Sequence, residues 1–313
     1  MNLFLRILAV FLFIAASAVP AAAAETQKAV LVTGASSGIG RNIAERLASE
    51  GHFVYAGARK QSDLDELNQI DNVMAVRLDV TSQSDIDAAV ELVRKQGRGL
   101  WGIVNNAGVA VFSPMNQTPE DDIHFVMNVN VLGPYRVNRA FADLLAESGG
   151  RTTTIGSISG FIAGPQSGTY SMSKFAVEAY TDSLAAELAE TGVHVSVIEP
   201  GGYKSKIREK VVTYTLERAD DGILEISDED RARMEQVIEQ NETLKEPDEV
   251  ADAAVHALFS ESPKRRYMVT PNVQQADVTI RSAMRRVVQL NDDQPYTYDR
   301  DELIAILDEL LAE

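Results

Sequence analysis

The sequence AVLVTGASSGIG, residues Ala29–Gly40, decides the fold. Its apolar first part, 29–33, predicts a short buried strand, and the helical spacing of apolar residues over 43–48 predicts a helix. Between them lies a turn spaced T-G-x-x-x-G-x-G. Glycines let a backbone approach a pyrophosphate, and free N–H groups at a helix start face the anion, so a nucleotide-binding site is predicted. Its residues are Gly34, Ser36, Ser37, Gly38, Ile39 and Gly40.

The alternation of strand and helix continues along the chain. Six further runs predict strands at residues 53–56, 73–78, 102–105, 151–155, 193–198 and 267–270. Helical patterns lie at 84–94, 120–145 and 170–189. Asn130 and Pro134 predict a local break in the second of these helices. The pattern predicts a Rossmann-type, doubly wound α/β fold, with a seven-stranded parallel sheet and helices on both faces.

The chain divides into three parts by this pattern. Residues 28–272 form the predicted dinucleotide-type domain, and residues 273–313 form a tail with one final helix at 301–311. Residues 1–24 precede the domain. They contain a basic residue, Arg6, an apolar run at 7–19 and four alanines at 21–24, which together predict a cleaved secretory signal peptide and export to the periplasm or the medium.

The alternative for the first segment is an N-terminal membrane anchor. Residues 7–24 are 18 residues without a charge, which barely reaches the length that spans a bilayer. In either case, membrane contact is expected only through residues 1–24.

Acidic residues outnumber basic ones. The 313 residues include 46 aspartates and glutamates against 29 lysines and arginines, a formal net charge of −17. More than half of this excess lies in residues 215–250, where 13 acids accompany 4 bases. A chain this acidic is a poor candidate for binding the nucleic-acid backbone, which needs a basic surface, so no nucleic-acid partner is expected.

Cysteine is absent. Disulfide bonds, thiolate catalysis and cysteine-ligated zinc are therefore excluded. The four histidines are scattered and form no H-E-x-x-H pattern, so no metal site is predicted.

The end of the second predicted strand bears on the choice of cofactor. A site for NAD carries an acid there that holds the ribose hydroxyls. This chain has Ala58, Arg59 and Lys60 instead, with no acid before Asp63. A guanidinium can bind a 2′-phosphate through paired hydrogen bonds, so Arg59 favours NADP(H) over NAD(H). The alternative is that Arg59 and Lys60 are ordinary solvated cations.

Tyr170 and Lys174 stand four residues apart at the start of a predicted helix, which places the ammonium near the phenol. A phenol titrates near about 10, and a neighbouring cation favours its ionised form and brings proton exchange into range. Ser157 follows the fifth predicted strand, at the sheet edge where ligands bind, and can hydrogen-bond a substrate oxygen. Ser159 and Ser167 lie in the same loop and are alternatives by position.

Taken in order, these motifs resemble those of the short-chain dehydrogenase/reductase superfamily, in its common T-G-x-x-x-G-x-G and Y-x-x-x-K form. The resemblance spans Lys28 to about Thr270 and is nearest to steroid- and retinol-type members. It implies a catalytic tetrad and further contacts to the cofactor. The tetrad would be Asn130, Ser157, Tyr170 and Lys174.

The further cofactor contacts follow from the same resemblance. Asp79 and Val80 would contact the adenine, Pro200-Gly201 would back the nicotinamide, and the Ser205 hydroxyl would replace a threonine that touches the carboxamide. The implied cofactor residues beyond the turn are Arg59, Asp79, Val80, Asn105, Ala107, Gly108, Tyr170, Lys174, Pro200, Gly201 and Ser205.

The expected function is hydride transfer between NADP(H) and the carbonyl or alcohol carbon of a small molecule, with Tyr170 giving or taking the proton. Residues 202–246 are interpreted as a substrate lid over an apolar pocket, with a solvated helical cap as the alternative. The long lid and the 199–203 run resemble those of steroid- and retinol-type members, which implies a hydrophobic ketone or alcohol as the substrate. The resemblance also implies a homo-oligomer, either a dimer or a tetramer. The alternative function is a non-catalytic nucleotide-binding or scaffold protein on the same fold.

Overall fold

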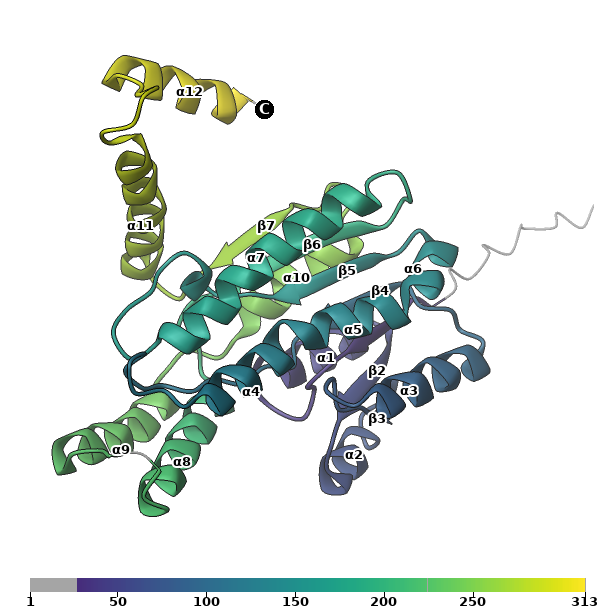
Figure 1. The fold of residues 1–313 in the computed structure, drawn as a ribbon. Coiled ribbons are helices and arrows are strands. Elements are labelled where there is room, and N and C mark those ends of the chain that lie inside the picture. The colour runs from purple at the N-terminus through teal and green to yellow at the C-terminus, as the bar shows by residue number, and fades with distance from the viewer. Residues whose placement is uncertain (1–26, 224, 313) are drawn as a thin grey trace, which may run out of the picture.

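The computed structural model describes residues 27–223 and 225–312 (Figure 1). Seven strands form one sheet in which every neighbouring pair is parallel, so the predicted Rossmann-type fold is confirmed. The order across the sheet is β3-β2-β1-β4-β5-β6-β7. The strands are β1 (Ala29–Val32), β2 (Phe53–Ala58), β3 (Val73–Arg77), β4 (Gly102–Asn105), β5 (Arg151–Ile155), β6 (His194–Pro200) and β7 (Arg266–Val269).

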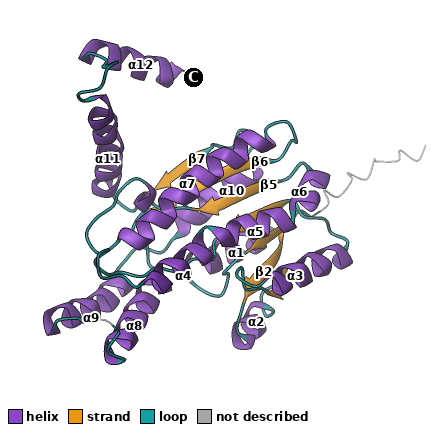
Figure 2. Cartoon of the chain, in the orientation of Figure 1, coloured by secondary structure: helices purple, strands orange, loops and turns teal. Residues whose placement is uncertain are grey.

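Helices cover both faces of the sheet (Figure 2). They are α1 (Gly38–Ser49), α2 (Gln61–Leu67), α3 (Gln83–Gln96), α4 (Glu120–Asn130), α5 (Leu132–Ala140), α6 (Ala142–Ser148), α7 (Gly168–Leu188), α8 (Lys206–Asp220), α9 (Asp228–Glu242), α10 (Asp248–Phe259), α11 (Val273–Asn291) and α12 (Arg300–Ala312), with a short 3₁₀ turn, η1 (Ile158–Gly160). In Figure 1, α3, α5 and α7 lie in front of the sheet, and α1 and α10 lie behind it.

Each face of the sheet has its own apolar core. Strands β1, β2 and β4 are buried along their whole length, because helices cover both faces, and apolar runs such as AVLV suit that position. On one face, Ile43 and Leu47 of α1 pack with Leu258 of α10. On the other, Ile86 of α3 packs with Phe141. The predicted apolar stripe of the first helix is therefore the one that packs on the sheet.

The helix predicted at 120–145 is three helices, α4, α5 and α6. The first break falls at Val131, beside the expected position. Pro134 has no N–H to donate to the carbonyl of Asn130, so the helical hydrogen-bond ladder stops there. Gly133 also packs tightly on Val80, since a Cβ atom on Gly133 would lie 2.8 Å from Val80 Cγ2. The break predicted from asparagine and proline is confirmed.

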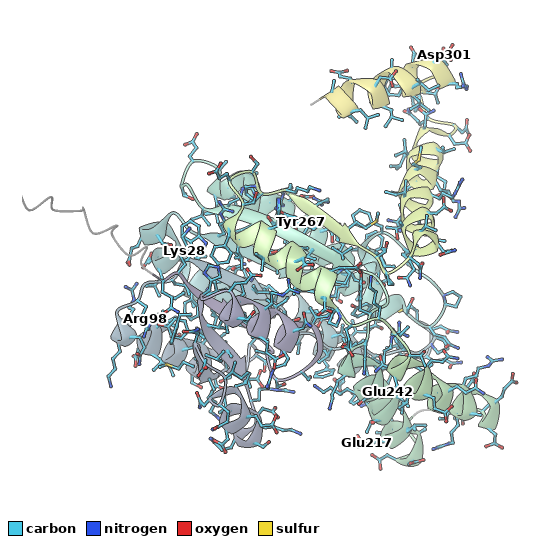
Figure 3. All side chains as sticks on the ribbon, turned by 180° about the vertical axis from the view of Figure 1, so that it is seen from behind. Lys28, Arg98, Glu217, Glu242, Tyr267 and Asp301 are labelled. Carbon is cyan, nitrogen blue, oxygen red and sulfur yellow. The ribbon has the colours of Figure 1, made fainter. Side chains whose placement is uncertain are left out.

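The segment interpreted as a lid, residues 202–246, holds the neighbouring helices α8 and α9. Figure 3, which labels Glu217 and Glu242, shows them projecting from the body of the protein. The Tyr214 hydroxyl donates to Asp122 Oδ1 at 2.6 Å, and Arg218 pairs with the same carboxylate at 3.3 Å. Because Asp122 lies on α4 and is fully buried, α8 is anchored to the body of the domain.

The tail contains two helices where one was predicted. α12 matches the helix expected at 301–311, whereas α11 was not expected. The Asn272 side chain caps the start of α11 by accepting a hydrogen bond from the backbone N–H of Gln275 at 3.0 Å. The asparagine cap and the apolar spacing over 280–288 are the local signals for this helix.

The segment interpreted as a signal peptide or anchor, residues 1–24, lies outside the described residues. Among the helices that the structure describes, none is both long and apolar enough to cross a membrane. The interpretation of that segment therefore stays a prediction.

Candidate active site

A cleft of about 940 Å³ opens at the carboxyl end of the sheet. Six strands reach its wall through residues just after their ends: Gly34 after β1, Arg59 after β2, Asp79 after β3, Asn106 after β4, Gly156 after β5 and Gly201 after β6. Residues of α7 and α8, together with Gln275 of α11, line the rest of the cleft. Open parallel sheets bind their ligands at this edge.

The turn between β1 and α1 lies directly against the end of β4. Asn106 Nδ2 donates to the backbone carbonyls of Thr33 at 2.9 Å and Gly34 at 3.0 Å. The Thr33 hydroxyl accepts from the backbone N–H groups of Asn106 and Ala107, both at 3.0 Å. A Cβ atom on Gly40 would overlap Asn106 Nδ2, so this approach requires glycine at position 40.

The start of α1 fits a pyrophosphate. Ser37 is the N-cap residue, but its side chain makes no capping hydrogen bond, and the first turn contains no acidic residue. The N–H groups of that turn therefore remain available to an anion, which the helix dipole also favours. Gly34 and Gly38 adopt φ of +65° and +58°, a conformation that glycine adopts without strain. These features fit a dinucleotide cofactor.

Most of the predicted site residues line this single cleft. They are Gly34, Ser36, Ser37, Ile39, Arg59, Asp79, Val80, Ala107, Gly108, Ser157, Tyr170, Lys174, Pro200, Gly201 and Ser205. Gly38, Gly40, Asn105 and Asn130 lie behind its lining. Gly38 and Gly40 shape the turn: a Cβ atom on Gly38 would lie 3.4 Å from the Ser205 hydroxyl oxygen.

Asn105 does not border the cleft, contrary to what the resemblance implied. It is 3% exposed, and its Nδ2 donates to Asn138 Oδ1 at 3.1 Å and Thr152 Oγ1 at 3.2 Å. Successive side chains of a strand point in opposite directions, so Asn105 turns toward α5 and the next residue, Asn106, turns toward the glycine-rich turn. Asn106 is therefore the cleft residue of this pair.

Asn130 supports the cleft wall from behind. Its Nδ2 donates to the Val109 carbonyl at 2.8 Å and the Ser173 hydroxyl at 3.0 Å, and its Oδ1 accepts from the Val109 N–H at 2.8 Å. The Ser173 hydroxyl donates to the backbone carbonyl of Tyr170 at 2.7 Å. One amide at the end of α4 thus fixes a cleft residue, Val109, and the first turn of α7.

Tyr170 lies in that first turn and faces the cleft together with Ser157, the N-cap residue of η1. Burial raises the pKa of the Tyr170 phenol, while a hydrogen bond with Ser157 and the positive charge of Arg208 act in the opposite direction. The phenol is therefore neutral near pH 7. Phe112 packs edge-on against its ring, with the ring centroids 6.2 Å apart.

Lys174 lies one turn beyond Tyr170, and its Nζ is 5.5 Å from the centroid of the tyrosine ring, so the predicted proximity is confirmed. The ammonium donates to the backbone carbonyl of Ile155 at 2.8 Å. Burial lowers the pKa of Lys174 to about 8, although the charge of Glu178 raises it. The Arg208 guanidinium of α8 also lowers the pKa of Tyr170, a contribution that the sequence pattern did not predict.

Four basic side chains, the cleft cations, gather in one region of the cleft. Arg59 and Lys60 follow β2, and Lys206 and Lys210 come from the first turns of α8. Burial lowers the pKa of Lys210, and the charges of Arg59, Lys60 and Lys206 lower it further, while Asp63 opposes them. Because these cations repel one another, the group fits a bound anion.

Residues 28–215 match the family model of the short chain dehydrogenases. The chain belongs to this family. Its glycine-rich turn, its Y-x-x-x-K pair and its seven-stranded parallel sheet are the features from which membership was predicted, and that prediction is confirmed.

Relatives of known name support the same assignment. The mitochondrial D-beta-hydroxybutyrate dehydrogenase of Bos taurus is 34% identical over 77% of this chain and 76% of its own length. Retinol dehydrogenase 7 of Mus musculus is 31% identical over 77% of this chain and 79% of its own length. A solved short chain dehydrogenase/reductase from Burkholderia phymatum in complex with NAD superposes with a TM-score of 0.72, at 22% identity, over 87% of this chain and 98% of that one.

This short-chain dehydrogenase is therefore an oxidoreductase that interconverts an alcohol and a carbonyl group of a small molecule. The alternative of a binding module without chemistry is disfavoured, because the cleft holds the reactive side chains as well as the nucleotide-binding turn.

Several cleft residues of this dehydrogenase were not predicted. Asn106 was detectable, because it directly follows a buried strand. Arg208 and Lys210 lie on α8, where the sequence pattern does not show which side of the helix faces the cleft. Gln275 accepts a hydrogen bond from the Gly202 N–H at 2.7 Å, although it lies 73 residues away along the chain. No local signal marks such a contact.

Two buried carboxyl groups share one guanidinium, that of Arg266. Glu178 lies one turn beyond Lys174 on α7, Glu199 lies near the end of β6, and they are 7% and 2% exposed. Arg266 of β7 pairs with Glu178 at 3.2 Å and with Glu199 at 3.6 Å. Burial raises the pKa of Glu199 to about 8, and the Glu178 carboxylate raises it as well. The pair therefore retains a proton at neutral pH.

As the pH rises from about 5 to about 8, we expect this carboxyl pair to lower the free energy of unfolding of the dehydrogenase. Unfolded Glu199 ionises near 4.5, whereas the folded protein releases the proton only near 8, so the folded state binds more protons across this window. Glu199→Gln, which has no proton to lose, should weaken the decline in the free energy of unfolding, measured by urea denaturation at several pH values. The exposed Glu217→Gln is the matched control. Identical pH profiles for wild type and Glu199→Gln would contradict the assignment.

Proposed function

We propose that this dehydrogenase uses NADP(H) and acts on a ketone or alcohol with an apolar body. The observation that carries the proposal is the composition of one cleft: Tyr170 and Ser157 meet a nucleotide-binding turn there, and the cleft cations meet in the same space. Each part is required by a different portion of the reaction.

A bound nicotinamide would supply or accept the hydride. The Tyr170 hydroxyl would donate its proton to the carbonyl oxygen during reduction and take it back during oxidation. Its raised pKa suits this role, because the phenol keeps its proton until the oxygen becomes basic. The Ser157 hydroxyl would donate a hydrogen bond to the same oxygen and orient it.

Lys174 and Asn130 are proposed to support this proton transfer. The Lys174 ammonium would hold the ribose of the cofactor and return a proton to Tyr170, since a pKa of about 8 allows exchange near neutral pH. Asn130 touches no reacting atom in this scheme. It is a positioning residue that holds Val109 and, through Ser173, the backbone of Tyr170.

Replacing the phenol tests the proton-transfer step. Tyr170→Phe should lower the rate of NADPH oxidation with a panel of apolar ketones by about 10²-fold or more, because the proton donor is lost. NADPH binding, followed by fluorescence titration, should be retained. Tyr135→Phe on α5, 44% exposed, is the matched control and should keep full activity. Undiminished turnover in Tyr170→Phe would exclude this tyrosine as the acid.

The preference for NADP(H) is supported by the cleft cations. The Arg59 side chain is exposed enough to reach a ligand. Its guanidinium pairs with the Asp79 carboxylate, with nitrogen and oxygen 3.5 Å apart. Lys210 faces it from α8. A 2′-phosphate between them would relieve their mutual repulsion and form charge-assisted hydrogen bonds.

Removing either cation tests the preference. Arg59→Ala or Lys210→Ala should each raise the KM for NADPH by about 10- to 100-fold, the equivalent of one charge-assisted hydrogen bond. The KM for NADH should change little, since NADH lacks the 2′-phosphate. Lys95→Ala, on the exposed end of α3, is the control. Equal increases in the KM for NADPH and for NADH would show that these cations do not bind the 2′-phosphate.

An apolar substrate is supported by apolar side chains in the cleft that holds Tyr170. Val109, Phe112, Ile158, Ile207 and Val211 line this cleft; Phe112 packs on the Tyr170 ring, and Ile207 and Val211 come from α8. This lining supports the interpretation of residues 202–246 as a substrate lid. The likeness to retinol dehydrogenase 7 is in keeping with an apolar substrate, whereas D-beta-hydroxybutyrate dehydrogenase is named for a small hydroxy acid.

We also propose that residues 1–24 are a signal peptide that is removed during export. Export would take the enzyme away from the cytoplasmic cofactor pool. An uncleaved anchor with the enzyme facing that pool, a cofactor carried inside the protein, or an exported binding module without turnover would each resolve this conflict.

N-terminal sequencing of the protein recovered from cells tests this proposal. The mature chain should begin at Glu25, because Ala22 and Ala24 provide the small residues that cleavage requires. Ala24→Leu should block the cleavage and leave a longer chain. A wild-type chain that still begins at Met1 and sediments with membranes would assign residues 1–24 as an anchor.

A homo-oligomer, either a dimer or a tetramer, is also proposed. Leu132 of α5 and Met172 of α7 are large apolar side chains that are 44% and 38% exposed. They lie within the two long helices predicted at 120–145 and 170–189, and the family resemblance implies that these helices pair between subunits.

A further inference from the structure

Helix α12 carries an apolar stripe that nothing in the described chain covers. None of its residues is buried, and Ile304, Ile306, Leu307, Leu310 and Leu311 are between 37% and 75% exposed. The stripe follows the spacing of one helix face. A free helix of 13 residues is only marginally stable in water, so α12 requires a partner surface.

Helix α11 carries a second stripe of the same kind. Its inner side is held to the domain: the Ser282 hydroxyl donates to the Phe161 carbonyl at 3.1 Å, and Arg286 lies over the Phe175 ring at 4.2 Å. Its outer side presents Ile280, Met284, Val287 and Val288, each more than half exposed. The α11–α12 arm, residues 273–312, thus carries two uncovered apolar stripes.

The connection between the two helices keeps them from covering each other within one chain. Asn291 donates to the Tyr298 carbonyl and accepts from the Tyr298 N–H, both at 2.8 Å. Asp299 then caps α12 by accepting from the N–H groups of Asp301 and Glu302 at 2.8 and 2.9 Å. Figures 1 and 3 show the result: α12 runs crosswise to α11, and Asp301 lies far from the body.

The two helices are complementary in charge. α11 contains three arginines and one acid, Asp277. Arg286 lies over Phe175 on the inner side and Arg281 pairs with Asp277 at 2.8 Å, so Arg285 is the arginine left to contact another helix. α12 contains four acids and one arginine, which are Asp301, Glu302, Asp308, Glu309 and Arg300. The acidic α12 therefore complements the basic α11 in charge. Because the two helices do not cover each other within one chain, the α11 that α12 contacts belongs to a second copy.

We propose that α12 of one copy packs on α11 of a second copy, and reciprocally, so that two chains exchange their arms across a twofold axis. Such an interface is isologous, because each copy supplies both the acidic and the basic helix. It buries both stripes at once. It is distinct from the contact through α5 and α7 proposed above, and it does not depend on the identity of the substrate or the cofactor.

The absence of cysteine allows a direct test of the exchange. A full chain with Met284→Cys is mixed with a full chain with Leu307→Cys, and intermolecular disulfides are followed under mild oxidation. A disulfide requires Cα atoms within about 7 Å, so the mixed pair should cross-link rapidly. A mixture of Lys95→Cys, on α3, with Leu307→Cys is the matched control. Cross-linking no faster than in this control would overturn the exchange.

The mass of the particle in solution is the second measurement. Leu307→Lys, or a chain ending at Asn291, should halve the mass found by light scattering, because the arm contact joins two copies. Arg285→Glu should weaken the assembly, and adding Glu309→Arg to the same chain should restore it. An unchanged mass in Leu307→Lys overturns the proposal. So does binding of the wild type to phosphatidylglycerol vesicles that Leu307→Lys abolishes without any change in mass, since the stripe would then serve a membrane surface.

Discussion

The contact between the glycine-rich turn and the end of β4 is the constraint on which the site depends. Asn106 reaches the carbonyls of Thr33 and Gly34, and the Thr33 hydroxyl accepts two N–H groups in return. This network satisfies the buried polar groups where two parallel strands end, and it leaves the first N–H groups of α1 without an internal partner. A side chain at Gly40 would separate the two segments. The same close packing that completes the fold therefore creates the anion site.

Much of the fold and part of the site could be predicted from local sequence because their determinants are local. Apolar runs predict strands buried on both faces, and Pro134 interrupts a helix through its own missing N–H. The direction of a side chain at the end of a strand is harder to predict, because a shift of one residue turns the side chain from the cleft toward the core. Asn105 and Asn106 show this, for only the second faces the turn. The contact of Gln275 with Gly202 arises from tertiary packing alone, so no local sequence pattern predicts it.

Charge is distributed unevenly in this acidic protein, and the distribution has a consequence for binding. The acids concentrate on α9 and its surroundings, while the first turns of α8 bring Lys206 and Lys210 to the cleft beside Arg59. A negative surface around a positive cleft repels anions broadly but attracts one that can enter the cleft. The helix that carries these cations also supplies the apolar Ile207 and Val211. One helix thus contributes to both the proposed phosphate contact and the proposed substrate contact.

The anchoring of α8 joins these contacts to the proposed catalytic residues. Tyr214 and Arg218 of α8 bind Asp122, a fully buried carboxylate near the start of α4. The same helix ends at Asn130, which holds both backbone polar groups of Val109 and, through Ser173, the backbone of Tyr170. A displacement of α8 would therefore act on α4 at one end and reach the cleft wall at the other. Because a buried carboxylate without its partners is costly, these contacts hold the last two turns of α8 in place against α4.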